Sequence, residues 1–329
     1  MTSLRFRSLL AAVTTVALGA AVLSVAPAEA APGGAKVVEK VQRGLHRTDL
    51  NIKSKAMDGT VPVTVLSPGG SAPRGTLYLL DGADAGEKVS DWITKGGAAQ
   101  FFAGRNVNVV LPAGGGGSFY TNWMRKDGEL GKPQWETFLT EELPPLIADQ
   151  FGSNGRNAVM GLSMGGQSAF ALATRHPDLY NGVASLSGCP PVSEPANEAY
   201  VRTTVAKSGG DANNMWGPTG GKRWKAHDPS KRLDTLKGKA VYVSSGSGAI
   251  GPLDFTIKRD PSEGPEDAQI AAGSALEAAA YRCSLQFAAQ LTSAGINYTP
   301  GFRLIGTHNW VYWKQDLAGA WSTLAPSIT

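Results

Sequence analysis

A serine flanked by glycines is the feature of this sequence that most clearly indicates a catalytic residue. Gly161-Leu162-Ser163-Met164-Gly165 follows the apolar run Asn157-Ala158-Val159-Met160 and opens a segment of helical character. In a nucleophile elbow, a serine sits on a sharp turn between strand and helix, and glycines beside it allow close packing. The pattern predicts Ser163 as the nucleophile of an acyl-transfer reaction. A plain Gly/Ser turn between strand and helix is the alternative interpretation.

A serine hydroxyl is a weak nucleophile and needs a base, most often histidine, to take its proton. The chain has four histidines. His308 follows the last expected strand, within Gly306-Thr307-His308-Asn309-Trp310, and satisfies the chain order of serine, acid and histidine. We therefore predict His308 as the base and interpret His46, His176 and His227 as surface residues.

The acid that orients the histidine must lie between Ser163 and His308 in the chain, and two residues qualify. Asp254 follows an expected strand at 240–244, the commonest position for this acid. Glu277 lies in an Ala-rich helical segment, where it would otherwise belong to a solvated face. The residues alone slightly favour Asp254 and leave Glu277 open.

An oxyanion hole requires two N–H donors aimed at the reacting carbonyl. The first is expected from Met164, the residue after the nucleophile. The second is expected from Ala83, in the loop Asp81-Gly82-Ala83-Asp84 that follows an early strand. Each such donor typically contributes about 3 kcal/mol of transition-state stabilisation.

The elements that must position these groups alternate between strand and helix. Residues 50–67 read as an antiparallel pair joined by the turn signal Asp58-Gly59. Short apolar runs predict buried parallel strands, and longer periodic segments predict helices. This pattern predicts an α/β-hydrolase fold, a mostly parallel doubly wound sheet with antiparallel N-terminal strands. The strands are expected at 76–80, 107–111, 157–161, 182–186, 240–244 and 298–304, and the helices at 135–151, 164–174, 270–291 and 310–324.

The first thirty residues have the organisation of a secretory signal peptide. Arg5 and Arg7 precede an apolar run, and Ala28-Glu29-Ala30 is typical of a cleavage site, so the mature chain is expected to begin at Ala31. No later segment is expected to span a bilayer. We predict a secreted or cell-envelope protein with one catalytic domain over 31–329, and a loop-rich insert at 190–238 that forms a wall of the substrate cleft.

The charge and the pattern of possible metal ligands argue against several other classes of function. The formal net charge of +4 is too mild to indicate nucleic-acid binding. No spacing of His, Asp, Glu or Cys suggests a metal site, and no cofactor is expected. Cys189 and Cys283 either form a disulfide, as export would favour, or remain as two buried thiols.

A set of segments in this order resembles the secreted mycolyltransferases of the antigen 85 complex, across nearly all of the mature chain. The segments are Leu79-Leu80-Asp81-Gly82, Ser118-Phe119-Tyr120 before Trp123, Trp135-Glu136-Thr137-Phe138-Leu139-Thr140, the elbow, Met215-Trp216-Gly217-Pro218 and Gly306-Thr307-His308.

The resemblance implies that Ser163 attacks a mycolate ester, that His308 acts as base and then acid, and that Glu277 orients His308. It implies trehalose mycolates and cell-wall arabinogalactan as substrates, and it places Asp81 against the sugar. The family usually has arginine where this chain has Asp84. Phe119, Trp216 and Trp310 either line the acyl channel or pack the core.

Two other functions compete with mycolyl transfer. A secreted carboxylesterase could use the same scaffold and the same serine chemistry. The resembling family also includes members without catalytic residues and members that bind the matrix protein fibronectin, so a non-catalytic cell-wall or matrix-binding protein is a further alternative. The presence of Ser163, Glu277 and His308 together favours an enzyme.

Overall fold

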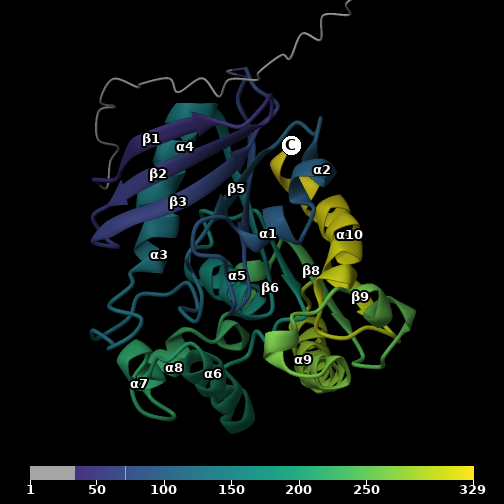
Figure 1. Cartoon of the computed structure of the whole chain (residues 1–329). Helices are drawn as coiled ribbons and strands as arrows, with labels where there is room; N and C mark the ends of the chain where they lie inside the picture. Colours follow the sequence, from purple (N-terminus) through teal and green to yellow (C-terminus); the bar gives the residue numbers. More distant parts are fainter. Residues whose placement is uncertain (1–33, 71) are drawn as a thin grey trace, which may run out of the picture.

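The computed structural model describes residues 34–70 and 72–329, in which the strands form one nine-stranded sheet (Figure 1). Its order is β1-β2-β3-β5-β4-β6-β7-β8-β9. The strands β1 to β3 pair antiparallel, β3 pairs antiparallel with β5, and the strands from β5 to β9 run parallel. The predicted signal peptide, residues 1–30, lies outside the described residues.

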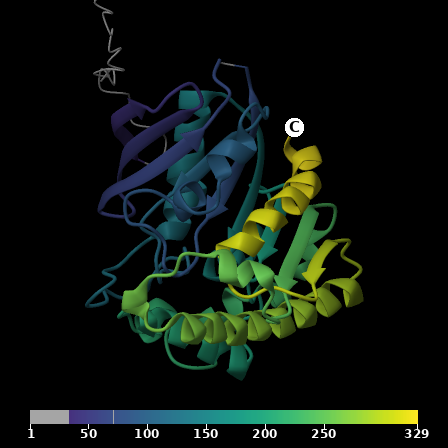
Figure 2. The same ribbon diagram turned by 45° about the vertical axis from the view of Figure 1, so that its right-hand side comes forward.

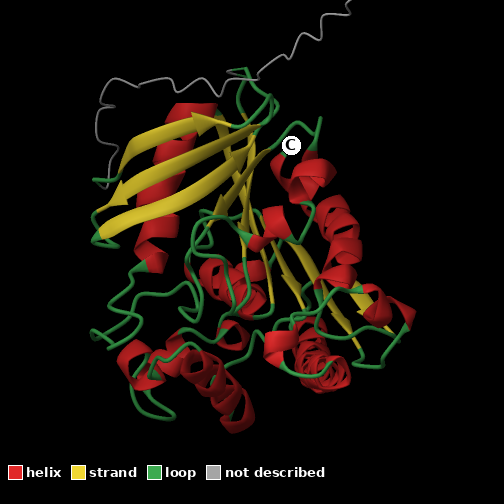
Figure 3. Cartoon of the chain, viewed as in Figure 1, coloured by secondary structure: helices red, strands yellow, loops and turns green. Residues whose placement is uncertain are grey.

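The parallel strands β4, β5, β7 and β8 are largely buried, as is the second half of β6, whereas the edge strand β9 is exposed or partly exposed. The pairing gives the sheet the mixed topology of the predicted α/β-hydrolase fold (Figure 3). The strands are β1 Lys36–Gln42, β2 Arg47–Ser54, β3 Gly59–Leu66, β4 Arg74–Leu80, β5 Asn108–Pro112, β6 Ser153–Leu162, β7 Gly182–Leu186, β8 Ala240–Gly246 and β9 Thr299–Arg303.

Helices cover both faces of the sheet, and α9 runs as one long rod past the parallel strands (Figure 2). A π-helical turn, Phe138–Glu142, joins α3 to α4. The helices are α1 Asp91–Thr94, α2 Ala98–Phe102, α3 Trp135–Thr137, α4 Leu143–Phe151, α5 Met164–Arg175, α6 Pro195–Lys207, α7 Ala212–Met215, α8 Lys222–Ala226, α9 Glu266–Ser293 and α10 Trp310–Ile328.

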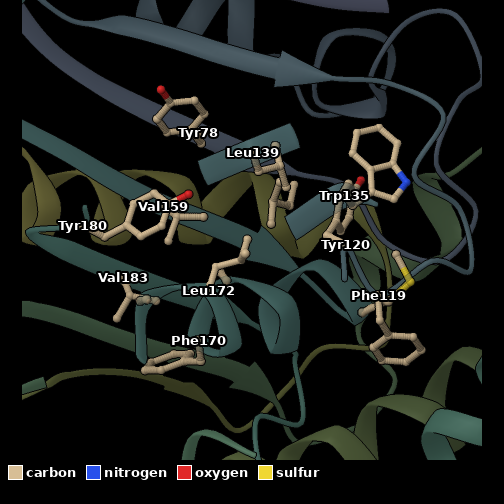
Figure 4. Packing of buried hydrophobic residues seen from close by; sticks show 14 of the residues in the cluster. Tyr78, Phe119, Tyr120, Trp135, Leu139, Val159, Phe170, Leu172, Tyr180 and Val183 are labelled. Atoms are coloured by element: carbon tan, nitrogen blue, oxygen red, sulfur yellow. The ribbon is translucent and has the colours of Figure 1, made fainter. Parts of the chain in front are cut away.

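Alternate residues of each central strand enter two separate hydrophobic cores, because successive side chains of a strand point to opposite faces. In β4, Leu77 and Leu79 pack on the face covered by α2 and α10. Tyr78 and Leu80 pack on the other face, among residues from α4, α5 and α9. Figure 4 shows part of this cluster, with Tyr78 of β4 and with Phe170 and Leu172 of α5. Burial on both faces explains why the sequence of these strands is apolar almost throughout.

Several parts of the chain differ from the sequence-based expectation, among them α1 and α2, for which no helix was expected. The strand β1 was not predicted, because its exposed, mostly polar residues give no clear apolar alternation. The insert at 190–238 contains three helices joined by loops, α6, α7 and α8, which gather below α5 in Figure 1. Proline at the first position of α6 and the buried Val201 and Val205 favour that helix despite the polar composition.

A disulfide joins Cys189, just beyond β7, to Cys283 of α9, across a sequence separation of 94 residues. Nearby, the Ser284 hydroxyl donates a hydrogen bond to the Gly188 carbonyl oxygen at 2.8 Å. The two links fasten α9 to the end of the parallel sheet. Both cysteines are buried, so the bridge is part of the packed interior.

We expect the double variant Cys189→Ala/Cys283→Ala to lose about 2–5 kcal/mol of unfolding free energy, because a bridge closing so long a loop strongly restricts the unfolded chain. Urea unfolding monitored by circular dichroism measures the change. Wild-type protein unfolded under reducing conditions should show the same midpoint as the variant. An unchanged midpoint in both samples would contradict a stabilising bridge.

Candidate active site

Ser163 lies where β6 ends and α5 begins, in a backbone conformation that few non-glycine residues adopt. Its φ is 51° and its ψ is −123°. The turn closes so tightly that a Cβ added to Gly161 would lie 2.2 Å from the Gly165 carbonyl oxygen. A Cβ on Gly165 would lie 2.3 Å from the Asp81 carbonyl oxygen. The two glycines of the pattern are therefore required by close approach, and the strain presents the Ser163 hydroxyl beyond the sheet.

His308 lies on the loop between β9 and α10, directly against Ser163. Its Nε2 is 2.8 Å from the Ser163 Oγ. The His308 backbone N–H donates to the Gly273 carbonyl oxygen of α9 at 3.0 Å, which fixes the loop. The Trp313 ring packs edge-on against the imidazole, with ring centroids 4.9 Å apart. An imidazole held in this position can accept the serine proton.

Glu277 of α9 is the carboxylate in contact with His308. Its Oε2 lies 2.7 Å from the imidazole Nδ1, and its side chain is fully buried. The other oxygen, Oε1, accepts hydrogen bonds from the hydroxyls of Ser187 and Ser245 and from the Gly246 backbone N–H, at 2.7, 2.9 and 2.6 Å. A buried carboxylate with these partners can hold one tautomer of the imidazole.

Asp254, which the residues alone slightly favour as the acid, has different partners. Its carboxylate accepts hydrogen bonds from the Thr307 hydroxyl, from the Tyr312 hydroxyl at 2.7 Å and from the Gly251 backbone N–H at 2.9 Å. Asp254 therefore holds the chain on both sides of His308 without contacting the imidazole. Glu277, rather than Asp254, is therefore the carboxylate that contacts the imidazole of His308.

Of the two predicted oxyanion donors, Met164 directly follows Ser163 in the chain, and Ala83 directly follows Gly82. Among the hydrogen bonds of the described residues, none is donated by the backbone N–H of Met164 or of Ala83. The Asp81–Ala83 loop approaches the elbow so closely that a Cβ on Gly82 would lie 3.6 Å from the Ser163 Cβ. Two free N–H groups at this place could stabilise a developing oxyanion.

Asp81, predicted to contact a sugar, is instead almost fully buried. Its carboxylate accepts hydrogen bonds from the backbone N–H groups of Asp91 and Trp92, at 3.2 and 3.3 Å, and so caps α1. The carboxylate is thus directed at the first turn of α1, and its assignment to sugar binding stays a prediction. Burial raises the pKa of Asp81 to about 7.

This pKa predicts a pH-dependent stability. Because the unfolded value is about 3.9, the folded state binds the Asp81 proton more tightly between about pH 4 and pH 7. The unfolding free energy should therefore fall as pH rises through this window, with Asp81 contributing up to about 1.4 kcal/mol per pH unit. Urea titrations across the window should show this component lost in Asp81→Asn and retained in Asp84→Asn, an exposed neighbour. An Asp81→Asn slope equal to that of the wild type would refute the assignment.

Of the three aromatic residues predicted to line a channel or pack the core, two are core residues. Phe119 and Trp216 are almost fully buried, and their ring centroids lie 5.9 Å apart. Trp310 is only partly buried, between Trp92 and Trp313, at centroid distances of 5.2 and 5.3 Å. Phe119 and Trp216 thus pack the core, which is one of the two alternatives expected for them, whereas Trp310 lies two residues from His308 on a partly open face.

The insert contacts the loop that follows β4 through α6. The exposed Lys207 at the end of α6 pairs with Asp84 at 3.1 Å. Burial raises the pKa of Tyr200, which also belongs to α6.

Glu136, from the Trp135–Thr140 motif, ties the insert to the core rather than taking part in the site. Its Oε1 lies 2.7 Å from Arg175 Nε and 2.7 Å from His176 Nε2, and its Oε2 lies 3.7 Å from His227 Nε2. Burial alone would raise the pKa of Glu136, but the two histidines and the arginine hold it below its usual range. His227 is buried and stacks on Trp216, which corrects its interpretation as a surface residue.

Three supporting residues also escaped prediction. Ser187, whose φ is 51°, and Ser245 lie at the ends of β7 and β8 and donate hydrogen bonds to Glu277. The Trp313 indole N–H donates to the Ser187 hydroxyl at 2.9 Å. The available signal was a Ser-Gly pair at the carboxyl end of each strand: Ser187-Gly188 follows β7, and Ser245-Gly246 ends β8. Ligand-binding and catalytic groups of open parallel sheets gather at this edge.

The search for other kinds of site covered the described residues only. Within them, no group of three or more His, Cys, Asp and Glu side chains is arranged to hold a metal ion. None of the helices in 34–70 and 72–329 has both the length and the apolar character that a bilayer crossing requires.

This chain is similar to known proteins in sequence and in fold. A family model described as "Putative esterase" matches residues 54–324. The chain is 33% identical over 310 residues to the diacylglycerol acyltransferase/mycolyltransferase Ag85C of Mycobacterium avium, a match that covers 92% of this chain and 83% of that protein.

The MPT51 antigen is similar in both sequence and structure. The chain is 38% identical over 199 residues to the MPT51/MPB51 antigen of Mycobacterium tuberculosis, but this match spans only 64% of that antigen's length and 60% of this chain. The crystal structure of M. tuberculosis MPT51 superposes with a TM-score of 0.69 and 31% identity. The superposition covers 84% of this chain and 96% of that one.

Proposed function

Because this chain belongs to the esterase family and, within it, to the antigen 85/MPT51 family, we propose that it is a serine acyltransferase that moves a mycolate between sugar hydroxyls. The observation that carries the proposal is the continuous contact from the Ser163 hydroxyl through His308 to the buried Glu277. We assign these residues the roles of nucleophile, base and orienting acid.

In the first half-reaction, the Ser163 Oγ attacks the carbonyl carbon of a trehalose mycolate while His308 Nε2 takes the hydroxyl proton. The negative charge that develops on the carbonyl oxygen is stabilised by the N–H groups of Met164 and Ala83. The bond to the trehalose oxygen then breaks, and His308 gives that oxygen the proton. The products are free trehalose and a mycoloyl ester on Ser163.

In the second half-reaction, a sugar hydroxyl takes the place of the departed trehalose. His308 removes the proton of that hydroxyl, whose oxygen attacks the acyl carbon, and the bond to Ser163 breaks with return of the proton to the serine. Trehalose as acceptor gives a dimycolate, and cell-wall arabinogalactan gives a mycolated wall. Water as acceptor would make the same residues an esterase.

We also propose that the protein acts in the cell envelope. A buried disulfide is typical of proteins that fold in an oxidising compartment, which supports the predicted export of the chain to the cell envelope. We propose that residues 31–329 act as a single catalytic unit in which α6 to α8 form one wall of the cleft, because Lys207 of α6 pairs with Asp84, the neighbour of the proposed oxyanion donor Ala83.

Product analysis after incubation with trehalose monomycolate tests the transfer reaction. We expect trehalose dimycolate to accumulate, and its yield relative to free mycolate to rise with added trehalose. The variant Asp84→Arg restores the residue usual in the family and reports on acceptor selection. Release of free mycolate at a rate independent of trehalose would identify a carboxylesterase and refute the transferase proposal.

A further inference from the structure

A cavity of about 230 Å³ lies at the end of the sheet that is far from the candidate active site. The turn between β1 and β2, the end of β3 and the helix α2 surround it. Val107, which lines the cavity, directly precedes β5, whereas Ser163 follows β6. Because β5, β4 and β6 run parallel, the cavity and Ser163 lie at opposite ends of these strands. In Figure 1, α2 lies near the top of the molecule and α9 at the bottom.

One wall of the cavity is apolar. Leu66, Phe102 and Val107 line it and are at most 5% exposed, and all three belong to the hydrophobic core on the α2 face of the sheet. Ala99 and Ala103 add two small side chains to this wall. A hydrocarbon group placed against these residues would be removed from water, which favours its binding.

The opposite wall carries positive charge. Arg43 and Arg47 line the cavity, and both pair with one carboxylate, that of Asp49, at 3.2 and 2.9 Å. Arg43 uses only its Nε in this contact, which leaves the other N–H groups of its guanidinium for a further acceptor. Since one carboxylate faces two guanidinium groups, a positive charge remains beside the cavity.

A third guanidinium, that of Arg74, lies next to this wall and is 4% exposed. Its hydrogen bonds within the described residues go to neutral oxygens, those of Asn106 at 3.2 Å, Ser67 at 3.0 Å and Gly69 at 2.9 Å. Ser67 lines the cavity, and its hydroxyl accepts from Arg74 while keeping its own hydrogen for another acceptor. Burial of a cation is costly unless a negative charge offsets it, so the surroundings of Arg74 favour an anion.

We propose that this cavity binds a small amphipathic anion, namely a carboxylate with a short hydrocarbon tail. The carboxylate accepts hydrogen bonds from Arg43, Arg47 and Ser67, and the tail lies on the apolar wall. The bound carboxylate supplies negative charge that the three guanidinium groups lack. Because the cavity lies at the far end of the sheet from Ser163, this ligand is additional to the substrate of the proposed function.

Isothermal titration calorimetry with sodium octanoate tests the ligand class. Acetate has the carboxylate without the tail, and 1-octanol has the tail without the charge. We expect each to bind at least about tenfold more weakly than octanoate, because the charge-assisted hydrogen bonds and the apolar burial both contribute to affinity. Acetate or octanol binding as tightly as octanoate would overturn the amphipathic ligand, and so would a wild-type protein that does not bind millimolar octanoate.

Three variants locate the binding site. Arg43→Gln/Arg47→Gln removes the charge of one wall, and Ala99→Leu fills part of the cavity. Arg156→Gln/Arg282→Gln is the matched control, since it removes the same charge from two exposed positions that do not line the cavity. We expect both cavity variants to bind octanoate at least about tenfold more weakly, and the control to bind it like the wild type.

Thermal unfolding without ligand verifies that each variant folds. Ala99 is an exposed position of α2, so Ala99→Leu keeps the test decisive even if the arginine variant unfolds. Equal octanoate affinity in the wild type and in the folded cavity variants would place the ligand elsewhere and overturn the inference.

Hydrolysis of a dissolved short-chain nitrophenyl ester separates this inference from the proposed function. All three variants should hydrolyse the ester at the wild-type rate, because none of them alters Ser163 or its partners. A wild-type protein that binds octanoate in this cavity but transfers no acyl group would contradict the transferase and leave the ligand site in place.

Discussion

The variant Ser163→Ala is expected to lower kcat for ester cleavage by on the order of 10⁶-fold, because it removes the atom that forms the acyl-enzyme. The fold should survive the change. Alanine has the same Cβ as serine at a φ of 51°, so it introduces no strain that the wild type lacks. Steady-state kinetics with a nitrophenyl ester gives the effect, and a urea unfolding curve verifies the fold.

Ser168→Ala is the matched control for this experiment. Ser168 lies one turn further along α5, is buried, and donates its hydroxyl hydrogen bond to the Met164 carbonyl oxygen at 2.8 Å. Its loss should cost about 1 kcal/mol of stability and leave kcat within about tenfold of the wild type. If Ser163→Ala kept more than about a hundredth of the wild-type activity, another residue would have to be the nucleophile.

The second large effect separates the two candidate acids. Glu277→Gln is expected to lower kcat by on the order of 10⁴-fold, because an amide facing His308 Nδ1 no longer fixes the tautomer that accepts a proton from Ser163. Asp254→Asn should lower kcat by less than about tenfold, since Asp254 bonds to Thr307 and Tyr312 rather than to the imidazole.

Thermal unfolding distinguishes loss of chemistry from loss of structure in these two variants. Both carboxylates are fully buried and hydrogen-bonded, so each substitution should destabilise the fold by about 1–3 kcal/mol. Similar losses of stability with kcat values that differ about a thousandfold would support the assignment of Glu277. Equal kcat values in the two variants, or a larger loss in Asp254→Asn, would contradict it.

The parallel strands and the elbow could be predicted because local signals and tertiary packing agree there. A strand such as β7, predicted at 182–186 and observed at Gly182–Leu186, is buried on both faces and therefore reads as an unbroken run of small and apolar residues. Ser163 sits between two glycines that the close approach of backbone requires. His308 could be chosen by its place after the last strand.

The acid could not be chosen from the residues alone, because the choice depends on contacts between distant segments. Glu277 meets Ser187, which is 90 residues away in the sequence, and Ser245, which is 32 residues away. The resemblance to the antigen 85 family, rather than any local pattern, pointed to Glu277. For the same reason, only the packed structure shows that Asp81 and Trp216 are buried.

The helix α6 shows the limit of composition as a guide. The polar and glycine-rich residues around it predicted loops, yet α6 extends over Pro195–Lys207. Its buried face includes Glu198, whose carboxylate accepts hydrogen bonds from Arg202 at 2.9 Å and from the Gly220 backbone N–H at 3.0 Å. Tertiary contacts of this kind outweigh weak local preferences.

Mass spectrometry of the intact protein after brief incubation with trehalose monomycolate tests the central claim most directly. The account predicts a mass increase of one mycoloyl group, located on the peptide that contains Ser163, absent from Ser163→Ala and discharged on addition of trehalose. Consumption of the donor with the acyl group on any other residue, or equal labelling of Ser163→Ala, would contradict it.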